Sequence, residues 1–202
     1  MKRLIVSLFI VVFTFSVAYA ATLTSPASLL EKRANQLVDK LKQNKNLIKK
    51  DKSYVMNIVS QAVLPLVDQE RMARSVFRRS LWTKASSAQR QAFIKQFRIL
   101  VLRTYAAAFS HYSDEVVKFR PLRGNWAKQT NVTVQSAIIQ QGAPAIPVNY
   151  SVTRKGNTWK VYDFTVDGIS MISSFRSQFE GINSKTLAQL TKKLALHNQR
   201  QI

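Results

Sequence analysis

The spacing of apolar residues changes once along this chain, and the change restricts the folds that it can adopt. Up to Tyr112, apolar residues recur every three or four positions, which is typical of one face of a helix. The longest such face begins after Ser86 and continues for about five turns. Beyond Asp114, apolar and polar residues alternate, which is typical of a strand with one buried face. Helices followed by consecutive strands predict an α+β fold.

Four antiparallel strands are expected, at residues 116–122, 130–139, 145–155 and 158–167. Turn residues such as Arg123-Gly124-Asn125 separate them, and the short connections favour antiparallel neighbours. In the last strand, strict alternation divides the apolar residues between two faces, with Trp159 and Val161 on one, and Tyr162, Phe164 and Val166 on the other.

Helices are expected on both sides of this sheet region. One begins at Ser25-Pro26, where Ser is a good N-cap and Pro fits the first turn. A polar connection at residues 43–51, a second helix ending near Pro65, and a third helix capped by Asp68 precede the long helix. Two more helices, at 170–181 and 184–197, follow the strands, and residues 198–202 are expected to form a polar tail.

Residues 1–20 have the three parts of a secretory signal peptide. Lys2 and Arg3 are followed by an apolar run at residues 4–12 and by the small-residue cleavage sequence Ala18-Tyr19-Ala20. A membrane anchor is the alternative, but the run is shorter than a bilayer-spanning helix requires. The expectation is a cleaved signal peptide and a single mature domain, residues 21–202, in the periplasm.

The chain is strongly basic, with 31 Lys and Arg against 10 Asp and Glu. Removal of residues 1–20 lowers the net charge from +21 to +19. Such a charge favours anionic partners. After export these are lipid headgroups, lipopolysaccharide or an acidic protein. A nucleic-acid binder is the other alternative, in which Trp82, Trp126 and Phe119 would stack on bases.

The residues needed for common catalytic sites are missing. The chain has no Cys, and its two His residues, His111 and His197, lack neighbours at metal-ligand spacing. Asp163 and Asp167 would lie about 13 Å apart along a strand, too far for a retaining carboxylate pair. No nucleophile elbow, dinucleotide fingerprint or P-loop occurs. The sequence therefore predicts a binding protein without a metal or other cofactor. Its apolar residues fill either an ordinary core or a cavity for an apolar ligand.

Several motifs, in order along the chain, carry a family resemblance. Pro147-Val148 precedes W-K-V-Y-D at residues 159–163, D-G-I-S-M-I at 167–172 and R-S-Q-F at 176–179. Further matching segments lie at 63–68, 71–74, 82–90, 93–98 and 102–106. Together they resemble the MlaC family of periplasmic phospholipid-binding proteins, also called toluene-tolerance proteins, over nearly the whole mature chain. One departure is Arg78-Arg79, where the family usually has Leu-Gly. The third helix therefore lacks a glycine that would readily end it in the left-handed conformation.

The resemblance implies a fold and a function. The fold would be a cystatin-like or nuclear-transport-factor-like cone, in which helices and a four-stranded sheet enclose a lipid cavity. The protein would carry phospholipid between an outer-membrane lipoprotein–porin complex and an inner-membrane ABC transporter with a ring of substrate-binding domains. This transport would maintain the lipid asymmetry of the outer membrane. The alternative is a basic envelope protein that binds lipopolysaccharide or an acidic partner without a lipid cavity.

Two sets of residues are expected to serve this function. The cavity wall would come from the sheet and from the helices, namely Leu64, Val67, Met72, Val76, Phe97, Val101, Tyr105, Val148, Tyr150, Tyr162, Phe164, Val166, Ile169 and Met171. The candidates for contact with headgroups or acidic partners are Arg71, Arg74, Arg90, Arg103, Arg120, Arg154, Lys160 and Arg176.

Overall fold

The computed structural model describes residues 23–110 and 115–200, without the side chains of Lys52 and of residues 106–110. The expected signal peptide and His111 lie outside these residues. The elements follow in the order α1 (Pro26–Gln43), α2 (Lys45–Lys50), α3 (Lys52–Val63), η1 (Leu64–Leu66), α4 (Gln69–Ser75), α5 (Arg79–Lys84), α6 (Ser87–Ser110), β1 (Val116–Phe119), η2 (Trp126–Lys128), β2 (Asn131–Ile139), β3 (Ile146–Lys155), β4 (Thr158–Val166), β5 (Ile169–Ser170), α7 (Met171–Glu180) and α8 (Leu187–Arg200).

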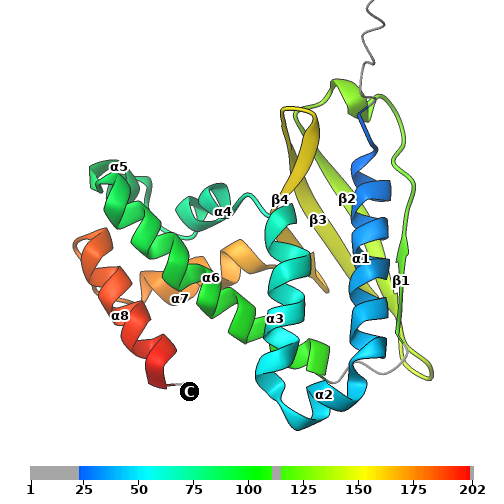
Figure 1. Cartoon of the computed structure of the whole chain (residues 1–202). Helices are drawn as coiled ribbons and strands as arrows, with labels where there is room; N and C mark the ends of the chain where they lie inside the picture. The colour runs from blue at the N-terminus through cyan, green and yellow to red at the C-terminus, as the bar shows by residue number, and fades with distance from the viewer. Residues whose placement is uncertain (1–22, 111–114, 201–202) are drawn as a thin grey trace, which may run out of the picture.

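The predicted α+β fold is confirmed (Figure 1). The strands form one antiparallel sheet in chain order, β1-β2-β3-β4-β5. It has one strand more than predicted, because Asp167 and Gly168 adopt φ of +48° and +82° and turn the chain back on β4. Positive φ at both central residues is typical of a tight hairpin turn. Ile169 and Ser170 then pair with the end of β4 before α7 begins.

The prediction of the faces of β4 was wrong, because the strand contains a β-bulge. Tyr150 of β3 lies opposite Phe164, but Val152 lies opposite Val161, so Tyr162 has no partner in the ladder. Residues directly opposite each other point to the same face. The extra residue therefore reverses the alternation, and Trp159 and Val161 share a face with Phe164 and Val166.

The two halves of α1 pack on different partners. Ala27 and Leu30 in the first half lie in a buried cluster with sheet residues Val134, Val152 and Trp159. The second half, by contrast, turns Leu37 and Leu41 toward α2 and α3, where Ile48, Val55, Ile58 and Val59 complete a separate cluster. Part of the connection predicted at residues 43–51 is thus helical, because Ile48 gives α2 a buried anchor.

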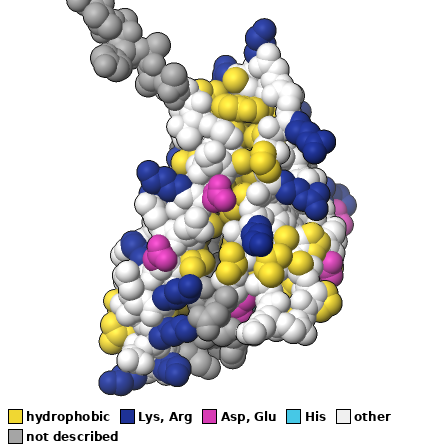
Figure 2. Space-filling model, turned by 90° about the vertical axis from the view of Figure 1, so that its right-hand side faces the viewer, with side chains coloured by type: hydrophobic (Ala, Val, Ile, Leu, Met, Phe, Trp, Pro, Cys, Tyr) yellow, Lys and Arg dark blue, Asp and Glu magenta, His cyan; other side chains and the backbone are white. Residues whose placement is uncertain are grey.

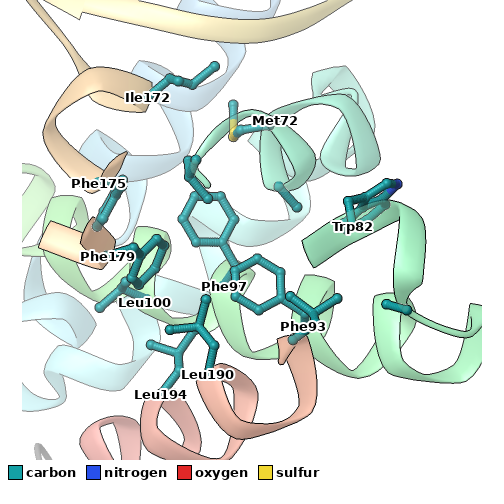
Figure 3. Close-up of a cluster of buried hydrophobic side chains, with 14 of the residues drawn as sticks. Met72, Trp82, Phe93, Phe97, Leu100, Ile172, Phe175, Phe179, Leu190 and Leu194 are labelled. Atoms are coloured by element: carbon teal, nitrogen blue, oxygen red, sulfur yellow. The ribbon is translucent and has the colours of Figure 1, made fainter. Parts of the chain in front are cut away.

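A third cluster, here called the helical cluster, joins α4 to α8 beside the sheet (Figures 1 and 3). Aromatic rings dominate it, with Phe97 edge-on to Phe175 at 5.3 Å and stacked with Phe93 at 5.8 Å between ring centroids. At its far end, the Asn198 side chain is buried and donates hydrogen bonds to the Gln96 carbonyl and side chain of α6. Helix α8 therefore extends into the segment expected to be a tail.

The third predicted helix is divided in two. Asp68 caps α4 as predicted, accepting a hydrogen bond from the Arg71 backbone N–H at 3.1 Å. The helix ends at Ser75, and the Ser75 carbonyl accepts hydrogen bonds from the Arg176 side chain of α7. A cation thus satisfies one of the carbonyls that a helix end leaves unpaired. The separate short helix α5 then begins at Arg79.

Asp163 connects β4 to α7, which leads to a stability prediction. Its carboxylate accepts hydrogen bonds from the Ser170 hydroxyl at 2.6 Å and the Ile172 backbone N–H at 3.1 Å. We expect Asp163→Asn to lower the free energy of unfolding by about 1 to 2 kcal/mol, because an amide cannot replace both charge-assisted bonds. Urea unfolding measures the change. The matched control is Asp39→Asn, which changes an exposed carboxylate on α1, and an equal loss in both variants would contradict the prediction.

Candidate functional site

The inner face of the sheet, under α1, changes in burial along the strands. At one end Val134 and Val152 are 0% exposed and Trp159 is 2% exposed. At the other end, Val117 lies opposite Ile138, and Ile138 lies opposite Ile146. These three side chains are only half-buried and belong to none of the three clusters. The contrast arises because the buried side chains of the second half of α1, Leu37 and Leu41, pack on α2 and α3 and not on these strand residues.

The half-buried region continues across the sheet to β4. The residues that we call the open sheet end are apolar except for the tyrosine hydroxyl, share the inner face and are half-buried, namely Val117, Ile138, Ile146, Tyr150, Phe164 and Val166. Val148 lies among them and is buried. None of these seven residues carries a charge, so the surface suits an apolar ligand.

Helix α6 approaches this surface at β4. The Tyr105 ring lies edge-on to Phe164 with 4.9 Å between ring centroids. Val101, one turn earlier, and Leu64 in η1 are half-buried. Apolar side chains on helix and sheet therefore face each other without being fully covered.

A cavity of about 200 Å³ opens between α1 and β1 at the edge of the open sheet end. Val38, Val116 and Val117 contribute its apolar lining, and Asn35, Asp39, Lys42 and Glu115 its polar rim. Because Val117 is the first residue of the row that leads to Ile146, the cavity adjoins the half-buried surface. Figure 2 shows this side of the molecule, where hydrophobic side chains reach the surface among Lys and Arg.

The structure divides the predicted wall residues into four groups. Met72, Val76, Phe97 and Met171 are buried inside the helical cluster, as ordinary core, whereas Val148 is buried in the sheet. Ile169 lies opposite Val166 at the start of β5 and shares its face, but its side chain is 67% exposed. The half-buried residues are Leu64, Val67, Val101, Tyr105, Tyr150, Tyr162, Phe164 and Val166. Among these, Val67 and Tyr162 lie at the other edge of β4, near the parallel bridge between Val67 and Val161.

Sequence reasoning did not identify Val117, Ile138, Ile146 or Val38 as part of this surface. The alternation in β1, β2 and β3 contained the information for the first three. The strand register was also needed to show that they form one row.

Most of the basic residues proposed for headgroup or partner contact are engaged within the protein. Each of six binds a carbonyl or amide oxygen, namely Arg71 (Asn131), Arg90 (Trp82 and Thr83), Arg103 (Asn198), Arg154 (Ala127), Lys160 (Pro65) and Arg176 (Ser75). The side chains of Arg74 and Arg120 make no such contact within the described residues, and both are exposed. Of these eight basic side chains, only those of Arg74 and Arg120 are therefore available to bind a ligand without first breaking a hydrogen bond to a described residue.

Two tyrosines bring hydroxyl groups to the apolar surface. Burial raises the pKa of Tyr150, and its hydrogen bond with Ser136 partly opposes the rise. Burial also raises the pKa of Tyr105, with a smaller contribution from the Asp163 carboxylate. Both rings therefore stay neutral at physiological pH, which keeps the surface uncharged.

The comparisons with known proteins agree on one family. A family model described as MlaC protein matches residues 31–196. The Intermembrane phospholipid transport system binding protein MlaC of Haemophilus influenzae is 31% identical over 165 residues, covering 80% of this chain and 76% of the relative. Toluene tolerance protein ttg2D of Pseudomonas putida is 24% identical over 155 residues, covering 77% and 71%.

A solved structure extends the similarity to three dimensions. The phospholipid-binding protein of Ralstonia solanacearum, determined in complex with a phospholipid, superposes with a TM-score of 0.79 at 25% identity. The match covers 88% of this chain and 98% of that protein. The shared fold thus includes the helices and the sheet together.

The raised pKa of Tyr150 leads to a prediction about alkaline stability. In the unfolded chain tyrosine ionises near pH 10, whereas the folded chain keeps Tyr150 protonated to higher pH. The folded state then binds more protons, so the free energy of unfolding falls as the pH rises above about 10. We expect Tyr150→Phe to reduce this fall, measured by urea unfolding at several pH values. Equal slopes in wild type and variant would contradict the assignment.

Proposed function

The chain belongs to the MlaC family, and on that premise we propose that it is a periplasmic phospholipid-binding protein that carries lipid between the outer and inner membranes. The observation that supports this most directly is the open sheet end, an uncharged apolar surface inside the fold that no helix fully covers. The Ralstonia relative with a bound phospholipid has the same fold and supports the same ligand class.

The energetics of lipid transfer explain why such a surface is needed. A lipid with roughly 30 methylenes loses on the order of 24 kcal/mol of hydrophobic stabilisation on leaving a bilayer, at about 0.8 kcal/mol per methylene. A carrier must replace most of this by covering the acyl chains with apolar side chains. Tyr105 on α6 meets Phe164 on the sheet, and both are only half-buried, as are Val101 and Val166, so these side chains are available to do so.

The transport role rests on the relatives and on the chain's charge. The Haemophilus relative is named as the binding protein of an intermembrane phospholipid transport system, and the expected signal peptide would bring this chain to the periplasm. Within residues 23–110 and 115–200, every helix is too short or too polar to span a bilayer. We propose that its partners are the outer-membrane lipoprotein–porin complex and the inner-membrane ABC transporter. No enzymatic step is part of this function.

A matched pair of neighbouring residues tests the lipid site. Val166 points to the inner face and Thr165 to the outer face of the same strand. We expect Val166→Asp to lower lipid affinity by more than about tenfold, because an unpaired carboxylate against acyl chains costs at least about 2 kcal/mol. Thr165→Asp should retain the lipid of the wild type. Mass spectrometry of organic extracts from purified, folded protein measures the bound lipid.

Three outcomes of this experiment would count against the proposal. Wild-type protein without lipid would favour the basic envelope protein with a filled core. Unfolding of Val166→Asp alone would place Val166 in a packed core, and equal loss of lipid in both variants would show that the inner face is not the site.

Salt should weaken docking to anionic surfaces without weakening lipid binding. Apolar burial is not weakened by moderate salt, whereas interactions between exposed charges are screened beyond about 8 Å at physiological ionic strength. We expect salt at about 0.5 M to slow lipid delivery to anionic vesicles and to leave bound lipid in place. Lipid retained after desalting and the transfer rate are measured on one sample. Loss of the lipid in salt would show that headgroup electrostatics holds it, and an unchanged rate would show that charge has no role in delivery.

A further inference from the structure

A second cavity, of about 500 Å³, lies at the α4–α5 corner of the molecule, beside the helical cluster. Arg74, Ser75, Arg79, Trp82 and Thr83 line it, and none of these residues is acidic. Figure 1 shows α5 at the end of the molecule away from the sheet, and Figure 3 shows Trp82 at the edge of the buried cluster. The cavity therefore shares no lining residue with the open sheet end.

Two further arginines hold the backbone of this cavity. Arg90 donates to the carbonyls of Trp82 at 3.0 Å and Thr83 at 3.4 Å, and its guanidinium lies 5.4 Å from the centre of the Trp82 ring. Arg176 donates to the Ser75 carbonyl at 2.6 Å. Three of the five lining residues thus have their carbonyl oxygens, which would repel an anion, bound to a cation.

In contrast, the two arginines that line the cavity, Arg74 and Arg79, are available to bind a ligand. Arg74 and Arg79 are exposed, and their side chains make no hydrogen bond, ion pair or ring contact with any residue in the described part of the chain. Two unengaged guanidinium groups face one cavity, with two engaged ones beside it. Such an arrangement is electropositive and has five N–H donors on each free group.

We propose that the α4–α5 cavity binds a phosphate ester carried on a small polar group, such as glycerol phosphate. Guanidinium groups match phosphate oxygens with paired hydrogen bonds, which an ammonium group cannot do. The Ser75 and Thr83 hydroxyls already donate to the Arg71 and Ser80 carbonyls, so the two arginines supply the donors for the phosphate. The volume lies within the range of small-molecule sites and exceeds what a lone phosphate fills, so it leaves room for the attached group beside the Trp82 indole.

The source of the ester is either a soluble metabolite or a headgroup at a membrane surface, and the experiment distinguishes them. Binding of glycerol 3-phosphate to the mature protein is measured by calorimetry. Binding to vesicles of phosphatidylglycerol and of phosphatidylcholine is measured by sedimentation. The test variant is Arg74→Gln/Arg79→Gln, and the control is Arg120→Gln/Arg123→Gln, which removes the same charge from exposed positions near β1.

We expect the test variant to weaken binding of the ester by more than about tenfold, as loss of charge-assisted hydrogen bonds predicts, and the control to change it less than about twofold. Loss with glycerol 3-phosphate alone assigns the site to soluble esters, and loss with phosphatidylglycerol vesicles as well assigns it to a headgroup. Equal weakening in both variants, or none in either, would overturn the site. Recovery of co-purified lipid from the test variant is measured in parallel, because it should not change whatever the function of the open sheet end.

Discussion

One extra residue on one strand of an antiparallel pair reverses the face to which the following side chains point, and in β4 that residue is Tyr162. Before the bulge, Trp159 and Val161 pack under α1, and after it Phe164 points to the same face and meets α6. Tyr162 itself packs against the helical cluster, with the Arg71 guanidinium 3.5 Å from its ring centre. The next residue, Asp163, accepts a hydrogen bond from the Ile172 backbone N–H in the first turn of α7. The bulge thus joins the sheet to the helices.

The open sheet end follows from a division within α1. An amphipathic helix can pack its apolar face on only a limited area, and here Leu37 and Leu41 are used on α2 and α3. The strands beneath them keep Ile138 and Ile146 half-buried. In an ordinary domain such apolar surface would be covered to gain stability. Its presence opposite Tyr105 and Val101, in a family with a phospholipid-bound relative, favours retention for a ligand.

Local features were predictable from the sequence, whereas pairings between distant residues were not. The alternation of Val148, Tyr150 and Val152 predicted β3 and its buried face, because a two-residue period depends only on local backbone geometry. At the bulge, Tyr162 contacts Arg71 of α4, which is far away in sequence, and no local pattern indicated this pairing. The exposure of Ile169 depends on the turn at Asp167-Gly168 and could not be read from the alternation. Val117 was not identified because its row forms only when the strands pair in the folded sheet.

The meander order of the sheet also affects how this protein meets other copies of itself. Unpaired backbone groups at a sheet edge can recruit a strand from another chain and start aggregation. Here β1 offers only four residues, with Lys118 exposed among them, and the opposite edge is occupied by β5 at Thr165 and Val166 and by the Asp68 backbone N–H at Val161. Within the described residues, neither edge offers a long template. Little sheet edge is therefore left for pairing with a second copy of the chain, even though the sheet keeps a half-buried apolar face.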